Sequence, residues 1–398
     1  MPFAVTAETN KVYASGSHEG RDALWEMDLT DRQNPVLVFA HPQVDADRPI
    51  LAKDGRMLGV LYETDRPFAF YTDQRANAVI EAVKRPLPAG SFNFIADYSR
   101  DEKIFLIHAS SDIDAGTYYV FDRTTSKLQR VGTAYPDLDK RQAELGRMQP
   151  IRYSARDGVE IPGYLTVPAG KRAENLPLIV MPHGGPAARD SLSFDWMVQF
   201  LANRGYAVLQ MNFRGSSGYG SDWLYAAHQD WGGLTYSDIL DGTQWAIKQG
   251  IADPKRVCIV GGSFGGYAAL LGAVRNSDVY KCAVSIAGVS DLIQLEDDGR
   301  RFTSGALRRE QIGTDRDKLK ADSPLRHADK ATIPVLMVHG DEDSQVRVEH
   351  SEDMASALKR SKKQYKFVKI KAANHQLDRQ SDRVTLLTEL EAFLKSNL

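Results

Sequence analysis

The sequence is poor in cysteine, has no long apolar run and carries almost no net charge. Its 398 residues include two cysteines, Cys258 and Cys282, too few for a disulfide scaffold or a cysteine-rich metal site. Each lies in an apolar run typical of a buried strand, so we expect two small core residues. No apolar stretch approaches the roughly 20 residues that cross a bilayer. A formal charge of -2 provides no overall basic field for nucleic acid or an anionic membrane.

The N-terminus lacks the basic start and apolar stretch of a signal peptide. Together with the other absences, this predicts a cytoplasmic protein that binds neither nucleic acid nor membrane. The composition, 42% hydrophobic and 26% charged, is that of a folded protein. Because 398 residues exceed one compact domain, we expect two domains.

The chain changes character near residue 150. Before that point, short β-like runs alternate with polar turns, and no long amphipathic helix is evident. An Asp or Asn turn precedes a strand at residues 10, 54 and 101, so these turns lie 44 and 47 residues apart. Such a period is typical of propeller blades, and a small irregular β-domain is the alternative. We predict a partial β-propeller-like all-β domain of about three blades over residues 1–140.

Three blades cannot close a ring, since propellers typically have about four to eight. An open array of blades exposes sheet edges and apolar faces. We therefore predict a homo-oligomer that forms through the exposed partial propeller.

After residue 150, apolar strands alternate with helical stretches, which is the pattern of a mostly parallel, doubly wound α/β sheet. The expected strands lie near residues 161–167, 178–182, 207–211, 257–261, 283–287, 335–339 and 365–370. The expected helices lie near residues 191–204, 235–249, 264–274, 349–359 and 382–397. We predict that residues 141–398 form this second domain.

The most informative segment is VCIVGGSFGGYAALLGA, in which an apolar strand runs into the turn GGSFG and then into a helix. This is the G-x-S-x-G nucleophile elbow in its strand–turn–helix context. Gly261 and Gly265 let the strand and the helix approach closely, and the turn lifts the Ser263 hydroxyl out of the sheet. The segment predicts an α/β-hydrolase fold with Ser263 as nucleophile. An idle serine in a turn is one alternative, and a phosphate loop, which lacks its Walker lysine here, is another.

A serine hydroxyl needs a base, and in this fold the partners follow in the order Ser, Asp or Glu, then His. Four histidines follow Ser263, and only His375 falls in a small-residue loop between the last strand and the last helix. We predict His375 as the base. The acid should follow the strand at residues 335–339, where HGDEDSQV offers three carboxylates. Position favours Asp341 or Asp343 and does not decide between them.

With these motifs the chain resembles the prolyl oligopeptidase family of serine peptidases, most of all its acylaminoacyl-peptidase-like branch. The matching stretches are MPHGGP, NFRGSSGYG, DPKRVCIVGGSFGGY, MVHGDEDSQV and the loop around His375. The resemblance implies peptidase activity, and its pattern H-G-x-x-D-x-x-V places the acid on Asp343. It also implies an N-terminal β-propeller that gates the site. The family propeller has more blades than we expect here, which puts size-gating of substrates in doubt.

The resemblance also helps to place the oxyanion hole. One donor is the backbone N–H of Phe264, and the second comes from the turn at Gly184 and Gly185. The expected reaction is acyl transfer, in which Ser263 attacks an acyl carbon, His375 moves the proton and water hydrolyses the acyl-enzyme. It requires no metal and no cofactor.

Three further residues beside these motifs are candidates for substrate binding, namely Arg214, Tyr219 and Tyr267. For Arg214 a buried ion pair that braces its loop is an equal alternative. The basic segment GRRFTSGALRR, at residues 299–309, lies between the nucleophile strand and the acid strand. We expect a solvated basic face there, with a cover over the site as the alternative.

The implied substrates are short peptides, including N-acylated oligopeptides. A carboxylesterase acting on small acyl esters with the same residues is the alternative, because esters need less leaving-group help and an incomplete propeller would leave the site open. A non-catalytic interaction protein built on a degraded hydrolase is a further alternative, against which the intact set of candidate residues argues. The carboxylates Glu8, Glu19, Glu26 and Glu63 are scattered and mark no pair that would hold a free amino terminus.

Overall fold

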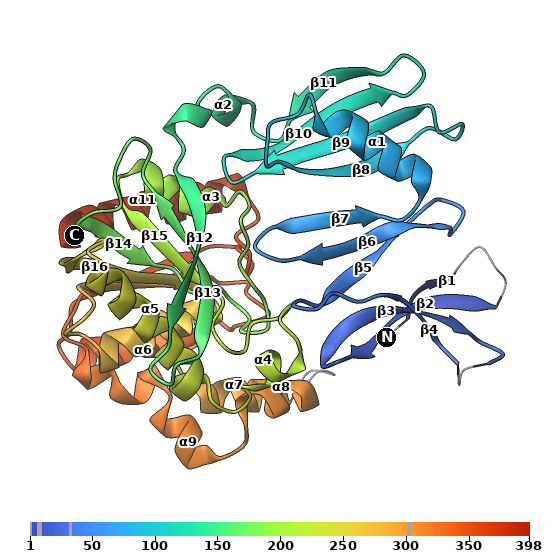
Figure 1. The fold of residues 1–398 in the computed structure, drawn as a ribbon. Helices are drawn as coiled ribbons and strands as arrows, with labels where there is room; N and C mark the ends of the chain where they lie inside the picture. Colours follow the sequence, from blue (N-terminus) through green and yellow to red (C-terminus); the bar gives the residue numbers. More distant parts are fainter. Residues whose placement is uncertain (1, 6–9, 32–33, 301–304) are drawn as a thin grey trace. The chain divides into compact units, whose positions relative to one another are not determined.

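The computed structural model describes residues 2–5, 10–31, 34–300 and 305–398. The chain folds into two compact units (Figure 1). The first comprises Met1–Pro150, Ser191–Asn203 and Gly218–Asp222. The second comprises Ile151–Asp190, Arg204–Ser217 and Trp223–Leu398.

The first unit contains three antiparallel sheets of short strands, each made of strands consecutive in the chain (Figure 1). The sheets are β1 (Pro2–Val5), β2 (Lys11–His18), β3 (Arg21–Asp28) and β4 (Val36–Phe39); β5 (Ala46–Leu51), β6 (Met57–Glu63) and β7 (Pro67–Tyr71); and β8 (Phe92–Tyr98), β9 (Ile104–Ser111), β10 (Asp114–Asp122) and β11 (Lys127–Thr133). Alternation directs one face inward: Phe105, Ile107 and Ala109 of β9 are buried, whereas the residues between them are less so. The predicted propeller-like all-β fold is confirmed.

The longest helix of residues 1–150 was not expected. Helix α1 (Gln74–Lys84) begins after Asp73, whose carboxylate accepts two backbone N–H groups of the first turn. The helix buries Ala76, Val79 and Val83, spaced three and four residues apart, in a core shared with β8, β9 and β10. The expectation that no long amphipathic helix precedes residue 150 is therefore wrong. The capping aspartate and the spacing of the apolar residues were the overlooked signal.

The second unit is built on an eight-stranded sheet in the order β12-β13-β15-β14-β16-β17-β18-β19. Strand β13 pairs antiparallel with β15, and the neighbours from β15 to β19 are parallel. The strands are β12 (Arg147–Ser154), β13 (Glu160–Val167), β14 (Leu176–Val180), β15 (Ala207–Met211), β16 (Ala252–Gly262), β17 (Cys282–Ile286), β18 (Val335–Gly340) and β19 (Tyr365–Ile370). Strands β15, β17 and β18 are buried throughout, as in sheets covered on both faces. This mostly parallel order confirms the predicted α/β-hydrolase fold.

Helices α5, α6, α10 and α11 pack against the strands of this sheet. The helices after α1 are α2 (Pro136–Asp139), α3 (Trp196–Asn203), α4 (Ser221–Tyr225), α5 (Tyr236–Lys248), α6 (Phe264–Arg275), α7 (Leu292–Gly299), α8 (Gly305–Ile312), α9 (Arg316–Ala321), α10 (Glu349–Arg360) and α11 (Gln380–Asn397). The predicted helices and strands agree with these to within about five residues, whereas β12, α2, α4, α7, α8 and α9 were not predicted. Among the described helices, none is both long and apolar enough to cross a membrane.

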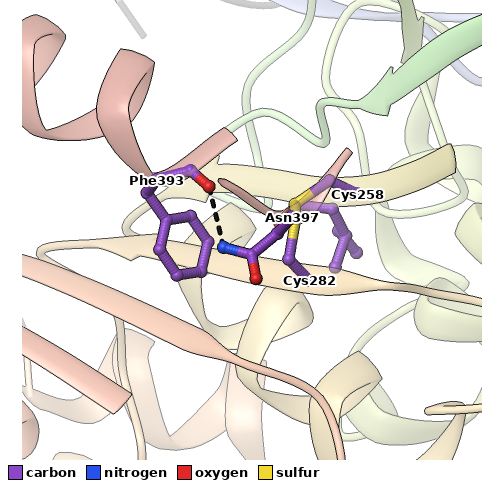
Figure 2. Close-up of a disulfide and its surroundings, with 5 residues drawn as sticks. Cys258, Cys282, Phe393 and Asn397 are labelled. Carbon is purple, nitrogen blue, oxygen red and sulfur yellow. Dashed lines mark hydrogen bonds between the residues drawn. A yellow bond between two sulfur atoms is a disulfide. The ribbon is translucent and has the colours of Figure 1, made fainter. Parts of the chain in front are cut away.

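Cys258 of β16 and Cys282 of β17 lie directly opposite each other on neighbouring strands and form a disulfide (Figure 2). Both are fully buried, and Phe393 and Asn397 of α11 lie in their surroundings. Their burial was predicted, whereas a disulfide between them was not expected. Two cysteines 24 residues apart give no sign of pairing until the strands lie side by side, which here brings their Cα atoms to 4.8 Å.

Candidate active site

Ser263 occupies the junction between a strand and a helix. Strand β16 ends one residue before it and α6 begins one residue after it, and Ser263 itself has φ 55° and ψ -117°. A residue other than glycine rarely adopts positive φ, so backbone strain is concentrated at this serine. The flanking glycines leave no room for side chains: a Cβ at Gly261 would collide with the backbone of Gly265, and one at Gly265 with the carbonyl of Pro182. This is the geometry of a nucleophile elbow.

Four backbone hydrogen bonds tie together the loops at the carboxyl ends of β16, β17, β18 and β19. The N–H of Ser263 donates to the carbonyl of Ile286 and that of Ala287 to the carbonyl of Val338, each at 2.8 Å. The N–H of Asp341 donates to the carbonyl of Ile370 at 3.1 Å, and that of Glu342 to the carbonyl of Ala373 at 3.0 Å. Because the strands are parallel, their carboxyl ends meet at one edge of the sheet, where ligands bind in open α/β folds. The Ser263 turn, the Asp343 loop and the His375 loop therefore share one backbone frame.

The carboxylate of Asp343 is buried and hydrogen-bonded at both oxygens. Its Oδ1 accepts the backbone N–H groups of Gln345 and Val346 at 2.8 and 2.9 Å. Its Oδ2 lies 2.5 Å from Nδ1 of His375 and 3.1 Å from Nε2 of His339. Burial alone would raise the pKa of Asp343, but the hydrogen bonds from the two histidines, the charge of His375 and the Val346 N–H lower it well below its usual range. Asp343 is therefore ionised at neutral pH.

His375 lies between β19 and α11, and its side chain is 8% exposed. Since Nδ1 faces Asp343, Nε2 is the nitrogen that points away from the carboxylate. The competing acid candidate, Asp341, is exposed, and its Oδ1 accepts the backbone N–H of Ala372 at 2.6 Å. The geometry thus favours Asp343, as the resemblance implied. Sequence reasoning missed the contact of His339 with Asp343, although their spacing of four residues in HGDED was a usable signal.

The turn expected to complete the oxyanion hole adjoins Ser263. A Cβ at Gly184 would lie 3.4 Å from Cβ of Ser263. Gly185 has φ +121° and precedes a cis peptide bond to Pro186. Phe264 is the first residue of α6, so its backbone N–H has no acceptor within the helix. The expected donors therefore belong to backbone segments on either side of the serine.

His183, just before this turn, packs into the sheet edge. Its ring stacks on Phe213 with centroids 4.3 Å apart, and its Nε2 lies 2.9 Å from Oγ of Ser216. Burial lowers the pKa of His183 to about 4, although the hydrogen bond with the Gly184 carbonyl acts in the opposite direction and raises it. A neutral imidazole thus supports the turn at neutral pH.

Arg214 is held in a buried ion pair. Its side chain is 9% exposed, and its Nε and Nη2 donate to the two carboxylate oxygens of Asp238 at 2.9 and 2.6 Å. Its Nη1 donates to Asp157 at 2.5 Å. The hydrogen bonds with Asp238 dominate the rise in the pKa of Arg214 above its ordinary value. Of the two alternatives for Arg214, these contacts favour the ion pair that braces its loop over substrate binding.

Tyr267 is also withdrawn from any substrate. It is fully buried in α6, and its hydroxyl donates to the carbonyl of Asp322 at 2.9 Å. The prediction that Tyr267 contacts substrate is therefore wrong, because the first turn of α6 directs this side chain into the core. Tyr219 belongs to the first unit, and its role stays a prediction.

The basic segment at residues 299–309 is described in part. Arg301 lies outside the described residues, as does Glu8 among the scattered carboxylates. Arg300 is 58% exposed at its side chain and pairs with Glu296 at 2.9 Å, as expected of a solvated face. Within the described ranges, no group of three or more His, Cys, Asp or Glu side chains is placed to hold a metal ion.

A mostly parallel sheet with a serine at a strand–helix junction and an Asp–His pair at the same edge defines the α/β-hydrolase class. The chain belongs to the prolyl oligopeptidase family, whose sequence profile matches residues 192–398. The family resemblance predicted from the motifs is confirmed.

Two curated relatives and one solved structure illustrate the similarity. The chain is 34% identical over 308 residues to dipeptidyl aminopeptidase BIII of Pseudoxanthomonas mexicana, which covers 74% of this chain and 44% of that protein. It is 30% identical over 232 residues to the acylamino-acid-releasing enzyme of Arabidopsis thaliana, covering 55% of this chain and 29% of that enzyme. A puromycin-hydrolyzing peptidase of Mycobacterium tuberculosis superposes with a TM-score of 0.81 and 25% identity, over 100% of this chain and 62% of that one. The chain thus spans about half or less of the length of these curated relatives.

Proposed function

We propose that the protein is a serine peptidase in which Ser263 is the nucleophile, His375 the general base and Asp343 the acid that orients the histidine. The observation that carries the proposal is the 2.5 Å contact between Nδ1 of His375 and the buried carboxylate of Asp343, at the same sheet edge as the strained Ser263. An ionised acid bonded to Nδ1 keeps the proton there and leaves Nε2 as the proton acceptor. Membership of a family named for a peptidase supports the same reaction.

In the proposed reaction, Ser263 Oγ forms a bond to the substrate carbonyl carbon as its proton passes to Nε2 of His375. The developing oxyanion is bound by the backbone N–H of Phe264 and by the turn at Gly184 and Gly185. Each such donor contributes roughly 3 kcal/mol to the transition state. The imidazolium, stabilised by Asp343, then protonates the leaving amine as the C–N bond breaks. Water hydrolyses the acyl-enzyme by the reverse proton path, and no metal or cofactor takes part.

The proposed substrates are short peptides, including N-acylated ones. The relatives are named for releasing acylated amino acids and for dipeptidyl aminopeptidase activity, so both blocked and free amino termini are worth testing.

The test is turnover of three chromogenic substrates by the protein and by a Ser263→Ala variant. These are an N-acetyl-aminoacyl p-nitroanilide, a free-amine dipeptidyl p-nitroanilide and a p-nitrophenyl ester of a short acid. We expect anilide turnover that falls by several orders of magnitude in the variant. Turnover of the ester alone would establish a carboxylesterase instead. A Ser263 that does not react with an organophosphonate would indicate a non-catalytic interaction protein.

Three further predictions from the sequence belong to this proposal. We propose a propeller-like domain over residues 1–140, a catalytic domain over residues 141–398 and a homo-oligomer. Exposed apolar side chains of the first sheet, Val5 at 62% and Val36 at 60%, support association, which light scattering in solution measures directly. A cytoplasmic location stays a prediction, and the buried disulfide counts against it, since disulfides are uncommon in cytosolic proteins.

A further inference from the structure

We propose that His339, which lies outside the Ser–His–Asp set, is a positioning residue that fixes the Oδ2 atom of Asp343 for His375. The inference rests on the proposed function, because it assigns His339 a role in the same reaction. His339 is the penultimate residue of β18 and is fully buried. A buried histidine must find hydrogen-bond partners for its ring nitrogens, and here one of those partners is the acid itself.

The surroundings of His339 determine where its proton lies. Its Nε2 is 3.1 Å from Oδ2 of Asp343 and 2.9 Å from the carbonyl oxygen of Val346. Both neighbours accept hydrogen bonds only, so Nε2 must carry the proton and donate. Its Nδ1 lies 2.8 Å from Oγ of Ser351, a fully buried hydroxyl in the first turn of α10. With the proton on Nε2, Nδ1 accepts from that hydroxyl, so both ring nitrogens have hydrogen-bond partners.

His339 supplies what the backbone does not. The N–H groups of Gln345 and Val346 both bind Oδ1 of Asp343, so they fix one carboxylate oxygen. Rotation about the Cβ–Cγ bond moves both oxygens together, and the backbone N–H groups of the loop oppose it at Oδ1 alone. Oδ2 is the oxygen that faces Nδ1 of His375. The Nε2–H of His339 donates to the same oxygen and so opposes the rotation at a second point.

The consequence is a line of contacts from Ser351 through His339 and Asp343 to His375, which makes the Ser351 hydroxyl a support for the acid. A mobile Asp343 carboxylate fixes the tautomer and the orientation of the His375 imidazole less well. This lowers the rate of the chemical step. Substrate binding does not involve the acid directly. Loss of His339 should therefore lower kcat and leave KM unchanged.

The experiment compares His339→Met with His339→Gln on the chromogenic substrate that the wild-type protein turns over. Methionine has similar bulk and no donor, whereas glutamine carries an amide N–H near the position of Nε2. We expect kcat of His339→Met to fall about tenfold or more with KM unchanged, and His339→Gln to recover most of that loss. Ser351→Ala, which keeps the imidazole and removes the partner of Nδ1, should show a smaller fall in kcat.

His350→Gln is the matched control, because His350 is equally buried, lies in α10 and makes its hydrogen bonds to the backbone of Ser290 and Asp291. It should lower the melting temperature and leave kcat unchanged. Equal kcat in wild type and His339→Met would overturn the inference. The inference would also be overturned if kcat fell in parallel with the melting temperature in both the His339 and the His350 variants. If His339→Met does not fold, the inference is tested with Ser351→Ala and His339→Gln instead. A kcat of Ser351→Ala equal to that of the wild type would then overturn the inference. Activity that survives in Ser263→Ala would instead refute the proposed function, and this inference with it.

Discussion

Gly265 lies so close to Pro182 that no side chain fits between them: an added Cβ would fall well inside contact distance of the Pro182 carbonyl oxygen. The first turn of α6 is thereby set against the end of the segment that leads from β14 to Gly184. One close backbone approach thus positions both the serine turn and the turn proposed to supply an oxyanion donor.

Gly265→Ala should therefore separate these two turns. We expect a loss of about 1–3 kcal/mol in the free energy of unfolding, as for overpacking, together with a large fall in kcat. Gly262→Ala is the control in the same turn, because its Cβ would meet its nearest neighbour, the Ile286 carbonyl oxygen, at 3.8 Å. Denaturant unfolding and turnover measure both. Equal effects of the two substitutions would show that the close approach is unimportant.

The buried pair of Arg214 and Asp238 predicts a stability defect rather than a binding defect. Arg214→Met leaves the fully buried Asp238 without its partner, which should cost about 3–5 kcal/mol. Arg156→Met, which removes a comparable pair with Asp241 at a side chain 57% exposed, should cost less than about 1 kcal/mol. Denaturant unfolding gives both values. A raised KM in Arg214→Met with unchanged stability would restore Arg214 to the substrate-binding residues.

Two buried histidines predict a loss of stability in mild acid. Burial lowers the pKa of both His183 and His350 to about 4, from 6.5. Between these values the unfolded chain binds protons that the folded protein does not, so stability falls as pH decreases from about 6.5 towards 4. Each histidine contributes at most about 3 kcal/mol to this fall. Urea unfolding at pH 7, 6 and 5 should show a shallower dependence for His350→Gln than for wild type. Parallel curves would contradict the assignment.

The disulfide predicts a thiol count. Alkylation of the unfolded protein without reductant should label neither Cys258 nor Cys282, and alkylation after reduction should label both. Reduction of a cross-link that closes a loop of this size should lower the free energy of unfolding by about 3 kcal/mol. A Cys258→Ala, Cys282→Ala double variant, which is insensitive to reductant, is the control. Two labelled thiols in the unreduced protein would mean that the pair is not oxidised.

Chain order and local context were sufficient to propose Ser263 as nucleophile and His375 as base from the sequence. A glycine-flanked serine between a strand and a helix has few other interpretations, and one histidine alone occupies the expected loop. The acid could not be chosen by position, since Asp341 and Asp343 follow the same strand. Which carboxylate faces His375 depends on how the loop turns, and that is set by the backbone N–H groups that bind Asp343.

The misses share a physical cause, which is that side-chain direction depends on neighbours remote in sequence. Tyr267 was a candidate for substrate binding, yet α6 directs its side chain inward. Cys258 and Cys282 are paired only because β16 and β17 are adjacent and in register. Helix α1 is different, because Asp73 and the apolar spacing after it were readable in advance.

The bond from the N–H of Ala287 to the carbonyl of Val338 closes a long excursion of the chain at its base. The chain leaves the sheet after β17, forms α7, α8 and α9, and returns at β18, just before the loop that carries Asp343. Within the excursion, Ser290 is bonded to His350 and Asp322 to Tyr267, so these two residues anchor it to α10 and α6. Substitutions in the excursion away from these anchors should therefore leave the start of the Asp343 loop in place.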